Sequence, residues 1–134
     1  MNPNLTIIIC SYNEIGNIEK TYEDLLLTIE KRQEKTEIIF IDNGSTDGTR
    51  EWLSKIDTPN IQVIFNEKNL GKGGSLKRGI KLSTGNYVVV HDSDFEYRAA
   101  DIWGCYDHAE SEKVSLVLGG RFEKGKVDGY SLIN

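Results

Sequence analysis

Short apolar runs alternate with longer amphipathic stretches, and this order is the feature that most limits the possible folds. Four runs rich in branched apolar residues predict buried strands: Leu5 to Cys10, Ile38 to Ile41, Ile61 to Phe65 and Tyr87 to Val90. Segments with helical periodicity stand between these runs. Neighbouring parallel strands need long crossover connections, which helices supply. The pattern therefore predicts an α/β fold with a Rossmann-like, mostly parallel sheet flanked by helices.

The intervening segments differ in the strength of their helical pattern. The clearest one runs from Asn17 to about Arg32, where apolar residues recur at three- and four-residue steps. Two further helices are expected around Trp52 and around Leu76. The helical pattern from Ile102 to Ala109 is weaker, and Val114 to Leu118 is predicted to form a further strand.

Length and composition set the broad class of protein. The chain has 134 residues, so residues 1–134 are expected to form one domain around one core. With 38% hydrophobic and 28% charged residues, it fits a soluble globular protein better than a disordered one. No apolar run reaches bilayer length and the first residues lack a secretory pattern, so we expect no transmembrane segment and a cytoplasmic location. The net charge of −5 argues against nucleic acid as a partner.

Polar residues follow three of the predicted strands, after Cys10, Ile41 and Val90. In open α/β sheets, ligands bind in the crevice outside the carboxyl ends of the strands. Because the three polar clusters would emerge at that edge, the sequence predicts a ligand site there. Neither a phosphate-binding Walker A loop nor a dinucleotide-binding glycine pattern is present in register, so those two nucleotide-binding classes are disfavoured.

The segment after Val90 carries carboxylates at alternate positions: Asp92, Asp94 and Glu96. If the chain stays extended there, these side chains project to one side, where their oxygens could share a hard divalent cation. A nucleotide diphosphate could complete the coordination, and the cation would neutralise charge on the departing diphosphate during sugar transfer. The competing interpretation is a solvated acidic turn. The position at a strand end favours the metal site.

The remaining candidates follow the first two predicted strands or lie in a glycine-rich loop. Tyr12 and Glu14 could contact a base and ribose, although Glu14 could also simply begin a helix, where the dipole favours a carboxylate. Asp42 is placed to hydrogen-bond a base or ribose. Lys72, in a glycine-rich loop, could approach phosphate together with backbone amides, with Lys77 as a further cationic candidate. Alternatively, the glycines form only a tight turn and Lys72 is solvated.

The chain resembles the family 2 glycosyltransferases over nearly its whole length. The resemblance rests on five segments in order: IIICSYNE, IDNGSTDGT, NLGKGGSLKRGI, STGNYVVVHDSDFEY and LVLGGRF. Within the family, the chain looks like the branch that contains dolichyl-phosphate and other polyprenyl-phosphate sugar transferases. The resemblance implies a GT-A nucleotide-diphospho-sugar fold, a UDP- or GDP-sugar donor, and Mg²⁺ or Mn²⁺ as the cofactor.

The resemblance also implies roles for individual residues by their motif positions. The implied nucleoside-binding residues are Tyr12, Glu14 and Asp42. The implied metal and diphosphate residues are Asp92, Asp94 and Glu96, and Ser93 between them is an implied nucleotide-sugar-binding residue. Arg121 matches a family arginine that faces donor phosphate or acceptor, and its alternative role is a surface ion pair. Asn43 stands where the family pattern often has a second aspartate.

The sequence covers the donor-binding part of the family pattern, and the acceptor-binding part is expected to be absent. The acceptor implied by the resemblance is a lipid phosphate or a saccharide, which is compatible with peripheral association at the cytoplasmic face of a membrane. The leading hypothesis is an enzyme that transfers a sugar from an activated nucleotide donor. The alternative is a nucleotide-sugar-binding remnant or interaction module without turnover of its own.

Overall fold

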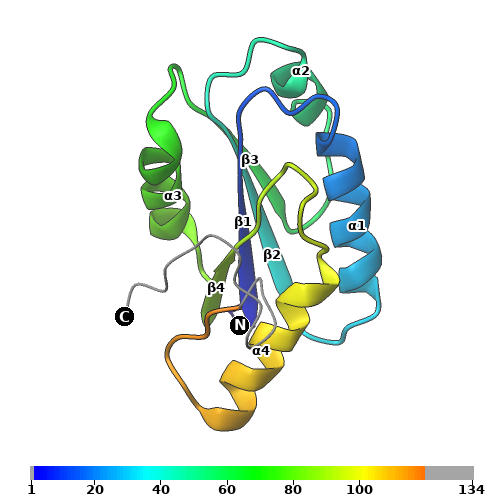
Figure 1. The fold of residues 1–134 in the computed structure, drawn as a ribbon, viewed down its shortest axis with the longest axis vertical. Helices are drawn as coiled ribbons and strands as arrows, with labels where there is room; N and C mark the ends of the chain where they lie inside the picture. Colours follow the sequence, from blue (N-terminus) through cyan, green and yellow to red (C-terminus); the bar gives the residue numbers. More distant parts are fainter. Residues whose placement is uncertain (1, 120–134) are drawn as a thin grey trace, which may run out of the picture.

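The computed structural model describes residues 2–119, which form a parallel sheet covered by helices on both faces (Figure 1). The four strands of the sheet are β1 (Leu5–Ser11), β2 (Thr36–Asp42), β3 (Ile61–Phe65) and β4 (Tyr87–Val90). They lie in the order β3-β2-β1-β4, and every neighbouring pair is parallel. The predicted α/β class and all four of the main strands are therefore confirmed.

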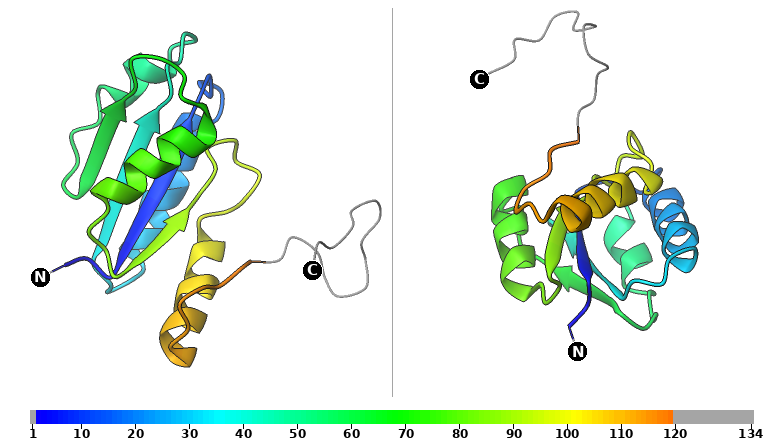
Figure 2. Two further views of the ribbon diagram at one scale, coloured as in Figure 1. Left: turned by 90° about the vertical axis from the view of Figure 1, so that its left-hand side faces the viewer. Right: turned by 90° about the horizontal axis from the view of Figure 1, so that it is seen from below.

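Helices connect the strands and cover the sheet unequally. They are α1 (Ile18–Glu30), α2 (Thr49–Leu53), α3 (Gly71–Leu82) and α4 (Ala100–Glu112). Figure 2 shows α3 on one face of the sheet and the other three helices on the opposite side. The weak helical pattern from Ile102 to Ala109 thus belongs to a helix of 13 residues. In the part of the chain that the structure describes, no helix is both long and apolar enough to cross a bilayer.

The two central strands are buried on both faces, which explains their nearly continuous apolar sequences. On one face, Ile7 and Phe40 belong to the larger core cluster, which includes residues of α1, α2 and α4. On the other face, Ile8 and Ile41 lie beneath α3. A Cβ on Gly79 of α3 would lie only 2.8 Å from Ile8 Cγ2, so the absence of a side chain lets this helix approach the sheet.

The strand predicted from Val114 to Leu118 is wrong. After α4 the chain turns at Lys113, which has a φ of 54°, and residues 114–119 contain no strand. Two of the apolar side chains, Leu116 and Leu118, are exposed. An apolar run becomes a strand only when a neighbouring backbone completes its hydrogen bonds and a face is buried. β4 lies at the edge of the sheet, but no described strand pairs with residues 114–119, and Leu116 and Leu118 are not buried.

Candidate functional site

The carboxyl ends of β1, β2 and β4 meet at one edge of the sheet, as the sequence predicts. Ser11 at the end of β1 is the register partner of Asp42 at the end of β2. Val90 pairs with Ile8, so the segment that begins at His91 leaves the sheet beside the last residues of β1. Figure 1 shows the connections that follow these strands at the same end of the molecule. The three polar clusters are thereby brought together.

A cleft of about 360 Å³ lies at this edge. It is lined by the end of β1, by segments that follow β1, β2 and β4, and by residues at the start of α3: Cys10, Ser11, Tyr12, Glu14, Asn43, Asn69, Gly71, Lys72, Asp92, Ser93 and Asp94. The predicted candidates Tyr12, Glu14 and Lys72 are among these residues, together with the segment from Asp92 to Asp94. A volume of this size is in the usual range of small-molecule sites.

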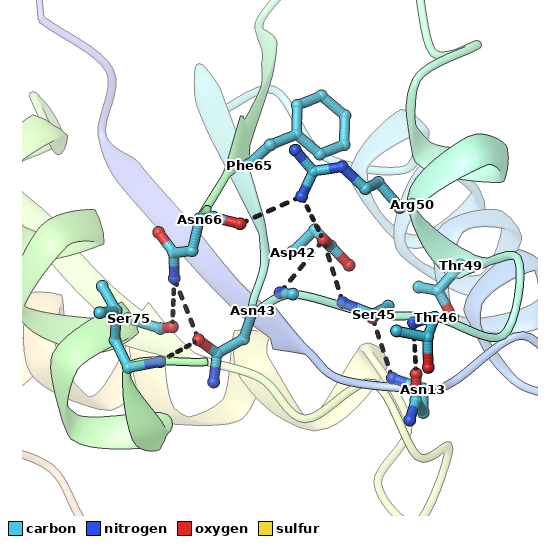
Figure 3. A network of polar contacts seen from close by, with 12 residues as sticks. Asn13, Asp42, Asn43, Ser45, Thr46, Thr49, Arg50, Phe65, Asn66 and Ser75 are labelled. Atoms are coloured by element: carbon cyan, nitrogen blue, oxygen red, sulfur yellow. Dashed lines mark hydrogen bonds and ion pairs between the residues drawn. The ribbon is translucent and has the colours of Figure 1, made fainter. Parts of the chain in front are cut away.

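The segment after β1 is fixed by hydrogen bonds to the loop after β2. The Asn13 backbone N–H donates to Ser45 Oγ at 2.9 Å, and the Thr46 N–H donates to Asn13 Oδ1 at 2.8 Å (Figure 3). These contacts hold Asn13 at a φ of 53° and leave Tyr12, which is 49% exposed, at the cleft. Glu14 precedes α1 by several residues, so it lines the cleft rather than beginning the helix.

Asp42 lies behind the cleft rather than on its wall. Its carboxylate is fully buried, and Oδ2 accepts hydrogen bonds from the backbone of Gly44 and Ser45 and from Arg50 Nη1 at 3.1 Å. Asp42 Oδ1 and the neighbouring Ser11 Oγ are buried without a hydrogen-bond partner among the described residues. A buried polar atom without a partner is costly, and these two atoms lie at paired positions at the ends of β1 and β2.

Asn43 joins the end of β2 to the start of α3. Its Nδ2 donates to Asn69 Oδ1 at 2.9 Å, and its Oδ1 accepts from Asn66 Nδ2 at 3.1 Å and from the Leu70 N–H at 2.8 Å. Figure 3 shows Asn66 reaching Ser75 of α3 as well. An aspartate at position 43 would have no N–H to donate to Asn69. The amide therefore suits this position because both of its polar atoms are used.

The glycine-rich segment forms the first turn of a helix rather than a loop. α3 begins at Gly71, so Lys72 is the second residue of the helix and its ammonium donates to Asp92 Oδ1. This hydrogen bond raises the pKa of Lys72 above its ordinary value. Lys77 is exposed and does not line the cleft. Arg78 donates to Asn66 Oδ1 at 2.6 Å and so supports the asparagine network.

The extended conformation expected after β4 is wrong. The chain bends from Ser93 to Tyr97, and Phe95 has a φ of 62°. Asp94 Oδ1 accepts the backbone N–H of Glu96 at 3.0 Å, which closes a tight turn. Asp92 and Asp94 consequently line the cleft, whereas Glu96 does not.

No group of three His, Cys, Asp or Glu side chains that could hold a metal forms within residues 2–119. A complete protein cage is not required for Mg²⁺, which proteins usually hold through one or two carboxylates together with substrate phosphates, and carboxylates suit Mn²⁺ equally. The carboxylates of Asp92 and Asp94 on one cleft provide this donor set. The residues present therefore fit the implied cation as a shared protein–phosphate site.

The acidic segment is anchored to the core at two points. Ser93 is buried, and its Oγ donates to the Cys10 carbonyl at 3.2 Å. Further along, Asp24 of α1 accepts from Arg98 Nη2 and from the Ala99 backbone N–H, each at 2.7 Å. The hydrogen bond from Arg98 lowers the pKa of the Asp24 carboxyl. These contacts fix both ends of the turn that carries Asp94.

Replacing Asp24 with asparagine is expected to destabilise the fold by about 1–3 kcal/mol at neutral pH, since a buried charge-assisted hydrogen bond is lost. The lowered pKa means that the carboxylate's contribution is complete above its ordinary pKa of 3.8 and disappears as the pH falls through the lowered value. The difference between wild type and Asp24→Asn should therefore shrink in acid. Urea denaturation at several pH values measures it, with Asp57→Asn at an exposed aspartate as the control. A pH-independent difference would contradict this role.

Ser11 belongs to the polar cluster that the sequence places after Cys10, whereas Cys10 itself looks like an ordinary strand residue, and its position at the end of β1 is the only available signal. Burial raises the pKa of the Cys10 thiol to about 11, so it is protonated and a poor nucleophile at neutral pH. Asn69 and Gly71 line the cleft because α3 begins there. Arg121 lies outside the described residues.

The fold is that of GT-A glycosyltransferases. The structure of Staphylococcus aureus TarS residues 1–349 in complex with UDP-GlcNAc is similar, with a TM-score of 0.65, 23% identity, and coverage of 82% of this chain and 32% of that one. The mannosyltransferase PcManGT from Pyrobaculum calidifontis, solved with GDP-Man and Mn²⁺, has a TM-score of 0.62 and 28% identity, with coverage of 77% and 31%.

The family follows from the sequence comparison. The model of glycosyl transferase family 2 matches residues 6–131, and the chain belongs to this family. Among curated proteins, a dolichyl-phosphate beta-glucosyltransferase from Dictyostelium discoideum is 33% identical over 129 residues, which is 87% of this chain and 39% of that protein. The chain thus spans about two-fifths of the length of this relative. The resemblance inferred from the motifs is confirmed at the level of the family.

Proposed function

We propose that this chain provides the nucleotide-sugar-binding part of a metal-dependent glycosyltransferase that uses a UDP- or GDP-sugar. The observation that carries the proposal is the cleft in which the carboxylates of Asp92 and Asp94 face the start of α3. A diphosphate needs cations and amide donors, and here a place for a divalent cation, a lysine and a helix start lie around one space. GDP-mannose and Mn²⁺ in the related mannosyltransferase are consistent with this donor class.

Each end of the proposed donor has its own group of residues. Asp92 and Asp94 would hold Mg²⁺ or Mn²⁺, and the bound cation would supply charge neutralisation for the departing diphosphate. Lys72, whose ammonium donates to Asp92 Oδ1, would also contact the diphosphate. Tyr12 and Glu14 would contact the nucleoside. Asp42 is buried behind the cleft wall, so it would contact the nucleoside only if the donor extended into that buried region.

The remaining assignments are predictions from the family resemblance. Ser93 would support the diphosphate region, where it lines the cleft and anchors the turn. Glu96 would coordinate the metal only if the turn at Phe95 rearranged. Lys77 does not line the cleft, so its side chain would have to extend around α3 to contact phosphate. Arg121 would face donor phosphate or acceptor. A lipid phosphate is the acceptor class favoured by the dolichyl-phosphate relative, and a saccharide is the alternative. A cytoplasmic location, with peripheral membrane association, remains the corresponding expectation.

The competing function is donor binding without turnover. The groups that line the described cleft, Lys72, Asp92 and Asp94, would hold a metal and a diphosphate, and donor binding alone already uses all of them. Incubating the purified chain with UDP- and GDP-sugars and Mn²⁺, with and without a polyprenyl phosphate, separates the two. Release of free nucleoside diphosphate that requires both metal and chain supports the transferase. Metal-dependent binding of the donor without release would support the binding module instead.

A further inference from the structure

We propose that Lys72 occupies the place of the divalent cation at Asp92 until metal and nucleotide arrive together. This inference rests on the proposed function and deepens it, because it makes metal binding conditional on the diphosphate. Lys72 is then a positioning residue that moves between two partners, the Asp92 carboxylate and the donor phosphate. The consequence is a cleft that binds metal weakly alone and well only as a metal–nucleotide pair.

The ion pair lies at the point where the proposed metal would bind. Lys72 Nζ donates directly to Asp92 Oδ1, and Asp94 lines the same cleft. An ammonium that donates to a carboxylate draws on the same negative charge that would bind a cation, and two positive charges at one carboxylate repel each other. Metal binding at Asp92 is therefore weaker while the ammonium stays there. Without metal, the Lys72 ammonium neutralises the charge of the Asp92 carboxylate.

The lysine side chain is able to make this exchange. The Lys72 side chain is 58% exposed and that of Asp92 is 34% exposed, so neither is locked in the core. A lysine carries its charge on a flexible four-carbon stem and binds phosphate as a point charge. The first turn of α3 also favours an anion nearby, which places a suitable new partner beside the lysine when a diphosphate binds.

The backbone that carries Lys72 is held in place, so the exchange falls to the side chain. Asn43 accepts the Leu70 backbone N–H and donates to Asn69, just before the helix begins. Further along α3, Gly79 lies close against the sheet. The helix start therefore remains at the cleft while the ammonium moves from carboxylate to phosphate.

The test compares Mn²⁺ affinity in Lys72→Met, Lys81→Met and wild type, measured by electron paramagnetic resonance with and without UDP or GDP. Lys81 lies in the last turn of α3, so its replacement removes the same charge far from the cleft. Without nucleotide, Lys72→Met should bind Mn²⁺ about threefold more tightly than wild type, as expected for removal of an exposed ion pair of ordinary strength. The increase in Mn²⁺ affinity on adding nucleotide should be smaller in Lys72→Met than in wild type and in Lys81→Met.

Two different results would overturn the proposal, and they are distinguishable. If wild type binds Mn²⁺ and nucleotide cooperatively but Lys72→Met has the metal affinity of Lys81→Met or a weaker one, the placeholder role is wrong and the proposed function stands. If wild type shows no coupling between metal and nucleotide, both proposals fail. Melting curves of the three proteins show whether the substitutions leave the fold intact, and Lys72→Ala provides a second variant if Lys72→Met is misfolded.

Discussion

Replacing Asp94 with asparagine is expected to weaken Mn²⁺-dependent nucleotide binding by at least about tenfold, since loss of even an outer-shell partner of a metal costs that much. The side chain keeps its approximate size, lies exposed at the cleft and accepts the Glu96 backbone N–H. An asparagine oxygen can still accept that hydrogen bond, so the turn should survive. The loss should therefore appear in the metal-dependent part of the affinity, as measured by calorimetric titration across Mn²⁺ concentrations.

The control for this substitution is Asp57→Asn, which removes one exposed carboxylate away from the cleft. Both variants should unfold within about 0.5 kcal/mol of wild type, as surface substitutions usually do. The stability measurement therefore shows whether a loss of binding comes from a damaged fold or from a damaged site. If Asp94→Asn binds nucleotide and metal as wild type does while its melting curve is also unchanged, Asp94 is a solvated turn residue and the strongest residue-level support for the site is lost.

Truncating Phe40 to alanine is expected to destabilise the chain by about 3–5 kcal/mol, the usual cost of removing a buried aromatic side chain. Phe40 is fully buried at the centre of β2, and its ring lies 6.3 Å from that of Tyr22 on α1. The truncation leaves a cavity where α1 meets the sheet. Urea denaturation measures the loss, and Leu27→Ala at a 59% exposed position of α1 should change stability little.

The expected loss of stability depends on Phe40 being buried where α1 packs against β2. A loss below about 1 kcal/mol for Phe40→Ala, or an equal loss for Leu27→Ala, would be incompatible with full burial of Phe40. The result also bears on the site, because β2 carries Asp42 and Asn43 at its carboxyl end. A poorly formed β2 would misplace the loop that holds both the segment after β1 and the start of α3.

The sequence predicts the fold well where local pattern and tertiary context agree. Residues 38–41 are apolar throughout because β2 is covered on both faces, and this pattern is visible without a structure. Residues 114–118 are also mostly apolar, apart from Ser115, but no strand in the described region pairs with them. Strand formation requires a partner far away in sequence, which a local pattern does not contain.

The site was predictable in its location and less so in its geometry. Tyr12, Lys72 and Asp94 all reach the cleft because parallel strands end at one edge. Glu96 lies outside that cleft because Phe95 adopts a left-handed backbone conformation. Phenylalanine is not a residue type from which a positive φ would be predicted. The use of Asn43 as a bridge is equally hidden, because it depends on where Asn69 lies in space.

The most direct test of the account is a calorimetric titration of the purified chain with UDP and with GDP, in Mn²⁺ and in excess chelator. Two carboxylates and a diphosphate repel one another unless a cation lies between them, so binding of at least one of the two nucleotides should require the metal. We expect saturable binding in Mn²⁺ and its loss in chelator. Equal affinity under both conditions, or no binding of either nucleotide to a folded chain, would contradict a metal-dependent donor site in this cleft.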